Sequence, residues 1–582
     1  MAAMPWLNDE VARRFGEIAT LLKLNDADPF RVRAYERAAS TISGVTVDLT
    51  ELTDAEIAKL KGIGAATAQK ITEFRDTGAI DMLERLKAEV PPGFTELVRI
   101  PGLGPKTIRT LYERLGIDSI DALRASLERD ELKGIPGLGV KSVENLRESI
   151  ERLGAKDERR IPVEEALAVA DELCRRLSAV PGVERVETAG SLRRMRETIG
   201  DVDLLVASAD PAPVMAALRD SDLVVKVIAA GEKKTSVLTV RGLQVDLRVV
   251  SPAEFGAALV YFTGSKAHNV RIRERALRKG LTLNEYALAD KESGAAVAAA
   301  TEEEIYAALG LAWVPPTLRE DTGEVDAASA GSLPDLVTLE AVRGDLHGHS
   351  DWSGDGKATL AEMLDAAAAK GYAYYAVTDH AENLTMNGLS RARMLAQREE
   401  IARLQERYPA MRILHGAELN IGVDGGLDYD GDFLLGYDFT VASVHSHFPR
   451  PQAEQTARII TAMRHPAVNV IGHPTGRKIG RRPGYDIDLD AVVAAAVETG
   501  TALEVNAHPA RLDLSGDMVR RAMDGGALLA ISCDAHRVRD LDLMRYGVAT
   551  AQRGWATAER VINTWTLEDL LGFVAAKRER GA

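Results

Sequence analysis

Cysteine is scarce in this chain of 582 residues, because only Cys174 and Cys533 occur and they lie far apart. Two isolated cysteines fit neither a disulfide framework nor a thiolate zinc site, so we expect a reducing, cytoplasmic environment. The sequence also has no apolar run long enough to span a bilayer. Its first residues lack the basic and apolar regions of a secretory signal, so no membrane association is expected.

A basic surplus is missing as well. Lys and Arg number 72 against 87 Asp and Glu, which gives a net charge of −15. Proteins that bind nucleic acid without sequence preference usually carry a basic surplus. The total charge therefore argues against a nucleic-acid partner, and such a partner would require local basic patches, backbone amides or bound metal ions.

Histidine is almost absent from the first 340 residues, where only His268 occurs. The other ten of the 11 histidines lie between His347 and His536. Histidine is the commonest ligand of transition metals in proteins. This uneven distribution predicts two regions with different chemistry, in a chain whose length suggests about three to five domains.

A Gly-hydrophobic-Gly element occurs three times in the first 150 residues, and a helical pattern follows each copy. A glycine turn between two short helices exposes amides at the N-terminus of the second helix, which suit a phosphate. The element resembles the helix-hairpin-helix motif, which grips the DNA backbone without reading its sequence; a plain glycine turn is the alternative. The residues expected to bind DNA are Gly62, Gly64, Gly102, Gly104, Lys106, Gly137, Gly139 and Lys141.

Three aspartates lie in two segments that predict strands. In residues 201–206, Asp201 and Asp203 share one face of the predicted strand. In residues 244–250, the apolar residues share one face and Asp246 lies on the other. Three carboxylates on adjacent strands can hold two divalent ions, which stabilise the attacking and leaving oxygens of a phosphoryl displacement. An isolated Asp-x-Asp pair is more often a solvated strand face, but the preceding Gly190-Ser191 favours a site.

That Gly-Ser pair resembles the nucleotidyltransferase signature, and residues 261–265 and 281–286 resemble the thumb of DNA polymerase beta and its family X relatives. The resemblance covers roughly residues 8 to 320. It implies that Asp201, Asp203 and Asp246 bind Mg²⁺ or Mn²⁺. It also implies contacts to the nucleotide phosphates by Gly190, Ser191 and Arg194, to the sugar by Tyr261, Phe262 and Gly264, to the base by Asn269 and to the template side by Arg273.

The N-terminal region resembles the deoxyribose-phosphate lyase domain of the same family, in residues 30–35 and 69–71. This resemblance makes Lys70 the candidate nucleophile, whose amine must be unprotonated to form a Schiff base. Two positions depart from the family pattern, because Ala66 stands where relatives often carry lysine and Phe30 where they often carry histidine. A surface lysine is the alternative interpretation of Lys70.

After residue 340, short apolar segments alternate with alanine-rich helical ones, which favours a parallel β/α layer or barrel. Candidate metal ligands follow the apolar segments, where such folds build their active sites. We expect Asp345, His347 and His349 to share one strand face. Further candidates are Asp355, His380, Glu418, His445, His447, His473, Asp534 and His536, whereas His415, His465 and His508 are expected to be structural.

This region resembles the polymerase-and-histidinol-phosphatase (PHP) domain, a distorted β/α barrel with a metal cluster. The resemblance implies the ligands His347, His349, Asp355, His380, Glu418, His445, His473, Asp534 and His536. Nitrogen and oxygen ligands without thiolate favour Mn²⁺ or Zn²⁺, which can activate water and neutralise a phosphate. The basic loop of residues 476–482 is expected to hold phosphates or a DNA backbone, with a solvated loop as the alternative.

These features predict a multidomain chain of α and α/β classes. It consists of a lyase-like helical domain (1–88), fingers with two helix-hairpin-helix motifs (89–157), an α+β nucleotidyltransferase palm (158–255), a mixed helical thumb (256–320), a linker (321–342) and a PHP barrel (343–575). The expected function is gap filling in base-excision repair by a monomer, on gapped or nicked DNA with dNTPs. The barrel would act as a 3′–5′ exonuclease or other 3′-end processing enzyme, with incision of abasic sites as a further candidate activity.

Three alternatives remain at this point. The first is a small-molecule phosphatase with an inactive polymerase module. The second is a non-catalytic scaffold that binds DNA ends. The third is template-independent nucleotide addition by the same polymerase site.

Overall fold

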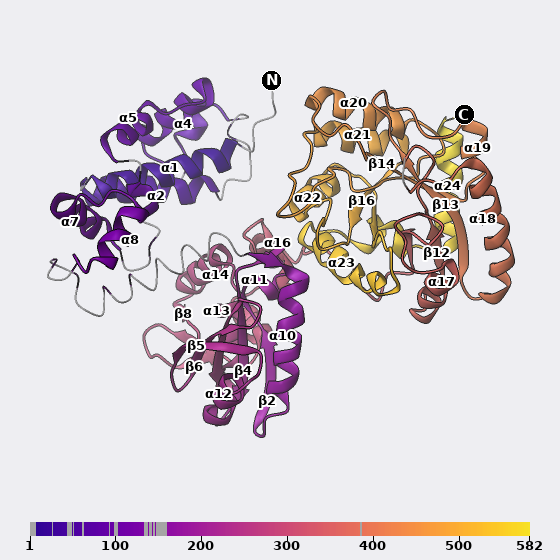
Figure 1. Cartoon of the computed structure of the whole chain (residues 1–582). Coiled ribbons are helices and arrows are strands. Elements are labelled where there is room, and N and C mark those ends of the chain that lie inside the picture. Colours follow the sequence, from indigo (N-terminus) through magenta and orange to yellow (C-terminus); the bar gives the residue numbers. More distant parts are fainter. Residues whose placement is uncertain are drawn as a thin grey trace. The chain divides into compact units, whose positions relative to one another are not determined.

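The computed structural model describes residues 7–581 apart from residues 26, 44–48, 50–51, 61–62, 92, 98–99, 101–102, 133–134, 136–137, 139–142, 144–145, 147–159 and 385–386. The chain forms two compact units, Met1–Arg160 and Ile161–Ala582 (Figure 1). No helix in the described ranges is both long and apolar enough to cross a bilayer.

The first unit is helical, and its core is built on the long helix α1. Val11, Phe15, Ile18 and Leu22 of α1 recur at helical spacing and are all buried, which is the pattern of a helix with one core-facing side. The other helices pack around this core. The helices of the unit are α1 (Leu7–Leu24), α2 (Pro29–Ser43), α3 (Asp54–Ile57), α4 (Ala65–Thr77), α5 (Asp81–Glu89), α6 (Phe94–Leu97), α7 (Pro105–Leu115) and α8 (Ile120–Glu128).

The described parts of two predicted glycine hairpins have the same local structure. Gly64 directly precedes α4 and Gly104 directly precedes α7, both with extended backbones, after the buried Ile63 and Leu103. The helices end alike, at left-handed glycines with φ of 73° and 68°. Gly62, Gly102, Gly137, Gly139, Lys141 and the side chain of Lys106 lie outside the described residues.

The palm is a five-stranded sheet of order β2-β4-β7-β6-β5 with helices on both faces. Helices α10 (Val163–Ser178) and α12 (Pro211–Arg219) pack against Val202, Leu204 and Val245, whereas α13 (Phe255–Thr263) packs against Leu205 on the other face. The predicted strands are confirmed as β4 and β7. The strands are β2 (Val183–Thr188), β4 (Asp201–Ser208), β5 (Val224–Ala230), β6 (Lys234–Thr239) and β7 (Gln244–Val250), beside the short pair β1 (Ile161–Pro162) and β3 (Thr198–Ile199) and the single turn α11 (Gly190–Arg193).

The thumb is joined to the palm by a buried cluster of charged side chains. Glu302 is 4% exposed and pairs with Arg193 of the palm at 2.8 Å and with Arg319 of the thumb at 2.7 Å. The thumb includes a basic helix, α14. The thumb contains α13, α14 (Lys266–Arg278), the sheet of β8 (Leu281–Leu283), β9 (Leu288–Asp290) and β10 (Ala296–Ala298), and α15 (Glu302–Ala308).

The segment predicted as a linker is structured. It contains helix α16 (Glu324–Ala330), whose first residue, Glu324, is fully buried. The Glu324 carboxylate lies 2.6 Å from Nδ1 of the buried His268 of α14. Residues 321–330 therefore pack onto the thumb.

The C-terminal region is a nearly closed parallel barrel, as the sequence predicts. Its seven strands pair in chain order, and a parallel bridge between Gly348 and Ala535 connects the first strand to the end of the last. Leu570 and Val574 of the last helix cover the apolar interior. The strands are β11 (Gly344–Gly348), β12 (Tyr374–Val377), β13 (Arg412–Asn420), β14 (Phe439–Ser443), β15 (Val470–Ile471), β16 (Ala502–Asn506) and β17 (Leu529–Ser532).

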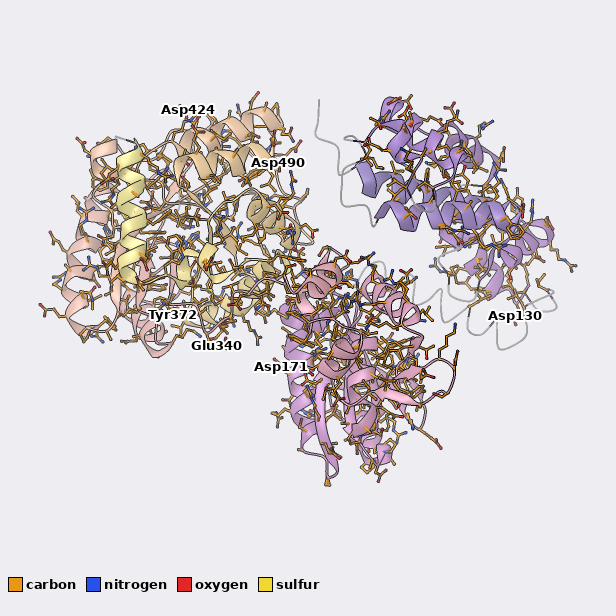
Figure 2. All side chains as sticks on the ribbon, turned by 180° about the vertical axis from the view of Figure 1, so that it is seen from behind. Asp130, Asp171, Glu340, Tyr372, Asp424 and Asp490 are labelled. Atoms are coloured by element: carbon orange, nitrogen blue, oxygen red, sulfur yellow. The ribbon has the colours of Figure 1, made fainter. Side chains whose placement is uncertain are left out.

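Helices surround this sheet, as Figure 1 shows. In Figure 2, seen from behind, side chains fill the space between sheet and helices, and Asp490 of α21 marks the helical layer. The helices are α17 (Leu360–Ala369), α18 (Arg391–Leu404), α19 (Gly431–Leu434), α20 (Gln452–Met463), α21 (Leu489–Thr499), α22 (Gly516–Asp524), α23 (Met544–Arg553) and α24 (Leu567–Gly581).

Candidate active sites

The three predicted carboxylates meet at one end of the palm sheet. Strands β4 and β7 run parallel, and their register pairs Asp203 directly with Asp246. The intervening Val202, Leu204 and Val245 are buried on the opposite face. Because side chains alternate along each strand, Asp201, Asp203 and Asp246 share the remaining face.

Negative charge accumulates at this end of the sheet. Burial and the charges of Asp201 and Asp246 raise the pKa of Asp203 to about 7. Burial alone would also raise the pKa of Asp246, but hydrogen bonds from Gln244, Ser236 and Lys234 hold it below its usual value. A divalent cation relieves this kind of repulsion, so the donor set fits Mg²⁺ or Mn²⁺.

Metal-free protein should therefore lose stability as Asp203 ionises. The folded state holds this proton more tightly than the unfolded chain, so the penalty is absent below the ordinary pKa of 3.8 and complete above about 7. In EDTA at about pH 8, Asp203→Asn should be more stable than the parent by at least about 1 kcal/mol. Thermal unfolding from about pH 5 to pH 8 checks this, and an equal or lower Tm for the variant at the upper end would contradict it.

Gly190 has no side chain, and the Asp203 carboxylate occupies the space that a side chain would fill. Its φ is +61°, and a Cβ at this position would lie 2.3 Å from Oδ2 of Asp203. The Gly190-Ser191 turn is also tied to β4, because the Ala189 N–H donates to the Asp203 carbonyl at 2.8 Å. The glycine is thus required both by the backbone and by the neighbouring carboxylate.

We expect Gly190→Ala to lower the kcat of nucleotide incorporation by at least about a hundredfold, because it displaces a carboxylate by about an ångström or more. Gly182→Ala is the matched control, since its φ is +83° but the nearest atom to an added Cβ is 3.9 Å away. Steady-state incorporation assays compare the two. Equal effects of both substitutions would show that backbone strain, and not the displaced carboxylate, is responsible.

Most of the other predicted nucleotide-binding residues lie in the thumb. Tyr261 and Phe262 form an edge-to-face pair with centroids 5.0 Å apart, and Asn269 donates to the Tyr261 carbonyl at 2.7 Å. A Cβ on Gly264 would lie 3.3 Å from Nη1 of Arg194, so these two residues adjoin. Ser191 is half-buried and Arg273 is exposed.

Three residues of this site were not predicted from the sequence. Lys234 lies 3.1 Å from the Asp246 carboxylate, and Gln244 donates to it at 2.8 Å. Arg248 lies over the Phe262 ring at 4.3 Å. Gln244 and Arg248 alternate with Asp246 on the same strand, so strand periodicity could have indicated them, whereas Lys234 enters from β6.

Lys70 lies on α4 and is half-buried. Among the residues that the structure describes, no hydrogen bond or ion pair engages its amine. Phe30, at the position where lyase relatives often carry histidine, is 75% exposed and lies under Arg33 at 4.7 Å.

The predicted ligands of the C-terminal region form a second cluster, at the carboxyl ends of the barrel strands. Three overlapping triads have the geometry to hold a metal ion: His349, His380 and His536; His347, His349 and Asp534; and His380, Glu418 and His445. The two remaining predicted ligands, His473 and Asp355, adjoin these triads. His473 Nε2 lies 3.1 Å from Glu418, and Asp355 lies 3.2 Å from His380 Nε2.

Glu418 is the shared carboxylate of this cluster. It is 1% exposed, and ring nitrogens of five histidines lie within 3.6 Å of its oxygens: His347, His349, His380, His445 and His473. Although burial opposes ionisation, the surrounding histidines hold the pKa of Glu418 well below its usual value. Burial lowers the pKa of His349 to about 3, so this ring is neutral at physiological pH.

Buried ring nitrogens without a well-aligned hydrogen bond support a metal at this position. Nε2 of His347, Nε2 of His349 and Nδ1 of His380 are buried and make no well-aligned hydrogen bond among the described residues, although an oxygen of Glu418 lies within 3.6 Å of each. Such lone pairs are what a metal ion would take up. Nitrogen and carboxylate donors without thiolate fit Mn²⁺ or Zn²⁺.

Two residues that orient the ligands were missed by sequence reasoning. Glu504 lies 2.7 Å from Nδ1 of His347, and the Asn420 side-chain oxygen lies 2.7 Å from Nδ1 of His445. Because each contact engages Nδ1, the Nε2 atom of the same histidine remains directed at the cluster. Residues that contact metal ligands from outside commonly fix the ring orientation in this way. Both residues lie near the carboxyl ends of barrel strands, so the rule that located the ligands could have located them.

Two sequence expectations need correction. Asp345 does not share the face of His347 and His349, because the register of β11 shifts between Asp345 and Gly348. Its carboxylate instead accepts hydrogen bonds from the N–H groups of His347 and Cys533. His447 is exposed and turned to the Ser446 hydroxyl, so it lies outside the cluster.

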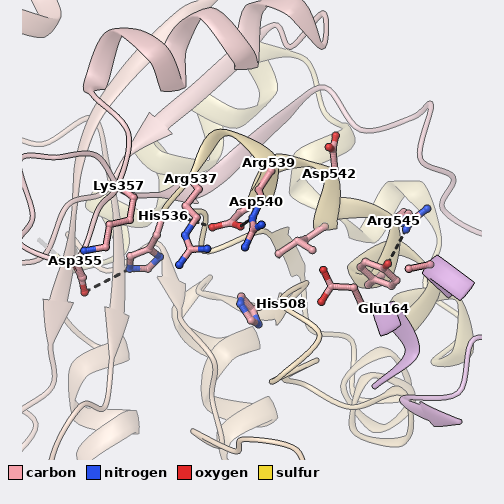
Figure 3. Close-up of a pocket in the computed structure, with 13 residues that line it drawn as sticks. Glu164, Asp355, Lys357, His508, His536, Arg537, Arg539, Asp540, Asp542 and Arg545 are labelled. Atoms are coloured by element: carbon pink, nitrogen blue, oxygen red, sulfur yellow. Dashed lines mark hydrogen bonds and ion pairs between the residues drawn. The ribbon is translucent and has the colours of Figure 1, made fainter. Parts of the chain in front are cut away.

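A pocket of about 670 Å³ opens beside the barrel cluster (Figure 3). Asp355 and His536 of the cluster line it together with Glu164 of α10. Four cations and two further carboxylates line it as well: Lys357, Arg537, Arg539, Arg545, Asp540 and Asp542. Within the described part of the chain no ion pair engages Lys357 or Arg537, so their charges are available to an anion.

Comparison with known proteins identifies domains in both the N-terminal and the C-terminal regions. Family models match a helix-hairpin-helix domain over residues 7–80, a SAM-like helix-hairpin-helix tandem over residues 94–152, the DNA polymerase beta thumb over residues 258–320 and the PHP domain over residues 345–508.

Relatives match the whole chain or the barrel alone. The DNA polymerase/3′–5′ exonuclease PolX of Bacillus subtilis is 39% identical over 568 residues, which are 97% of this chain and 99% of the relative. A probable phosphatase of Acetivibrio thermocellus is 34% identical over 167 residues, 28% of this chain and 65% of the relative. Because the first match spans both regions, the chain belongs to the family X DNA polymerases that carry a C-terminal PHP domain.

Proposed function

We propose that this protein fills gaps in DNA during base-excision repair and removes 3′-terminal nucleotides with its barrel. The observation that carries the proposal is the presence, in one chain, of two separate clusters of metal-ligand type. One has three carboxylates beside the Gly190-Ser191 turn, and the other has nine histidine and carboxylate side chains.

In the palm, Asp201, Asp203 and Asp246 would hold Mg²⁺ or Mn²⁺. Ions bound in the palm and in the barrel would neutralise phosphate charge and activate the attacking oxygen. Ser191, Arg194 and the amides of the Gly190 turn would bind the triphosphate of a dNTP. Tyr261, Phe262 and Gly264 would contact its sugar, Asn269 its base, and Arg273 the template side.

The glycine hairpins would bind the DNA backbone through amides at the N-termini of α4 and α7, preceded by Gly64 and Gly104. Amide contacts need no basic surplus, which reconciles a DNA partner with the net charge of −15. Gly62, Gly102, Lys106, Gly137, Gly139 and Lys141 would contribute to the same contacts. We further propose that the chain acts as a monomer on gapped or nicked duplexes.

The barrel substrate is proposed to be the 3′ end of a DNA strand. Lys357 and Arg537, which line the pocket beside Asp355 and have no ion pair among the described residues, support an anionic substrate such as a DNA strand. His347, His349, Asp355, His380, Glu418, His445, His473, Asp534 and His536 would hold Mn²⁺ or Zn²⁺ beside the scissile phosphate. The probable phosphatases that match the barrel favour the rival activity, hydrolysis of a small phosphate ester.

Primer extension on a gapped duplex and release of a 3′ label test the two activities separately. Asp201→Ala with Asp203→Ala should abolish extension and leave label release, and His347→Ala should do the reverse. Extension that persists in the double variant would refute the polymerase assignment. Turnover of small phosphomonoesters without DNA degradation would instead favour the rival phosphatase.

Lys70 is proposed as the nucleophile of a lyase activity. Borohydride trapping of the protein on DNA with a 5′-deoxyribose phosphate tests this, with Lys70→Ala as the variant and Lys59→Ala of the same unit as the control. Equal trapping of both variants would exclude Lys70.

A further inference from the structure

One carboxylate connects the palm, the thumb and the barrel beside the phosphate-binding turn. Oε1 of Glu320, the last residue of the thumb, lies 3.1 Å from Nε of Arg194 in the palm. The same oxygen lies 3.0 Å from Nη1 of Arg553, the last residue of α23 in the barrel. Arg194 and Arg553 are 13% and 8% exposed, so both guanidinium groups are largely withdrawn from water.

Arg553 also holds the backbone of the turn. Its Nη1 donates to the Arg194 carbonyl at 3.0 Å, so one side chain of the barrel contacts Arg194 directly and through Glu320. Arg194 directly follows α11, which begins at Gly190. Its own Nη1 donates to the Thr263 carbonyl, which fixes the guanidinium beside Gly264.

The position of Arg553 is itself determined by close packing. An added Cβ on Gly516, the first residue of α22, would lie 2.9 Å from Cβ of Arg553. The preceding Gln552 donates to the Val337 carbonyl at 2.8 Å and lies 3.3 Å from the Thr317 hydroxyl of the thumb. The end of α23 is therefore anchored on both sides of Arg553.

The charges of this group explain why a second arginine is needed. Arg194 and Glu320 alone form a neutral pair, which attracts a phosphate weakly. With Arg553 the group carries a net positive charge, and Glu320 can hold Arg194 in place without cancelling its attraction for an anion. Arg196 lies farther away, at 3.7 Å from Glu320, and is 46% exposed, so water screens its contribution.

We propose that Arg553 of the barrel is a positioning residue of the polymerase site, which acts through Glu320 and the Arg194 backbone to hold Arg194 for the dNTP triphosphate. The inference rests on the proposed role of Arg194 in phosphate binding. It makes nucleotide affinity in the palm dependent on the barrel, although Arg553 belongs to neither metal cluster.

The test is steady-state incorporation by the full-length protein. Arg553→Ala should raise the KM for dNTP about fivefold to tenfold, with kcat within about twofold of the parent. This is less than the loss of a direct charge-assisted hydrogen bond to the nucleotide, because Arg553 acts through Arg194. Arg553→Lys should recover part of the loss, because it restores the charge without the forked geometry. Release of a 3′ label should be unchanged in both variants, which shows that the barrel is folded.

Arg521→Ala is the matched control, since Arg521 lies on the neighbouring α22 and pairs within the barrel, with Asp490 at 2.8 Å. The decisive comparison is Arg194→Ala with and without Arg553→Ala. If Arg553 acts through Arg194, the second substitution should add little to the KM once Arg194 is gone. If Arg553→Ala loses label release, Arg553→Gln, which keeps packing volume and a donor, replaces it.

Three results would overturn the proposal. An unchanged KM in Arg553→Ala beside a raised KM in Arg194→Ala removes Arg553 from the site and leaves the role of Arg194 intact. Additive effects of the two substitutions also exclude the positioning role, because they assign Arg553 an independent structural role. An unchanged KM in Arg194→Ala would refute the proposed role of Arg194 itself, and the positioning role with it.

Discussion

Asp203→Asn should lower DNA synthesis by about a thousandfold or more, while 3′-label release continues. Asp203 pairs in register with Asp246 and borders Asp201, so its carboxylate lies between the other two possible ligands. An amide keeps the shape but removes the charge that would hold a divalent ion, and the transition-state stabilisation lost is on the order of 4 kcal/mol. Single-turnover incorporation on a gapped duplex measures the loss.

Asp220→Asn is a suitable control, because Asp220 is an exposed aspartate of the same domain at the end of α12. The variant at position 203 should be less active yet, in EDTA at about pH 8, more stable. A decrease in activity together with an increase in stability distinguishes the loss of a metal ligand from damage to the fold. Loss of activity together with a lower Tm would contradict the assignment of Asp203 as a metal ligand.

Glu418→Gln should have an effect of similar size on the barrel, with label release reduced by about a thousandfold and bound transition metal lost. Five histidine rings converge on this carboxylate, more than on Asp355 or Asp534. Removing its charge should also destabilise the metal-free barrel, on the order of 3 kcal/mol, since the nearby cationic rings lose their partner. Metal content, label release and thermal unfolding provide three independent measurements.

Glu399→Gln, on the exposed side of α18, is the matched control for this substitution. Primer extension should be normal in both variants, because Glu418 lies in the barrel. Retention of the metal and of label release in Glu418→Gln would show that the cluster is not the nuclease site.

Local periodicity accounts for most of what could be predicted from the sequence. Alternation placed Asp201, Asp203 and Asp246 on one face of β4 and β7, and the apolar strand ends located the barrel ligands. The alternation rule failed at Asp345, because the register of β11 shifts where it pairs with β12. Such a shift depends on the neighbouring strand and cannot be recognised from the alternation of polar and apolar residues in one segment.

Partners that come from distant segments could not be predicted. Glu320 and Arg553 are 233 residues apart in the chain, and Arg477 of the basic loop pairs with Glu197 of the palm across 280 residues. The sequence left open whether this loop is solvated or binds phosphate. In the structure Arg477 is engaged internally and Arg482 lies over Phe448 at 4.0 Å, so only part of the loop's charge faces a ligand.

The buried Glu302 has a consequence for how this protein can change over evolutionary time. Its carboxylate is shared by arginines from the palm and the thumb, both held at under 3 Å. Losing the glutamate alone would leave two arginine charges without a partner in a largely buried environment, whereas losing one arginine would leave a neutral pair. The glutamate is therefore the constrained position, and a thumb taken from another polymerase would leave Arg193 of the palm without this partner unless it brought a matching glutamate.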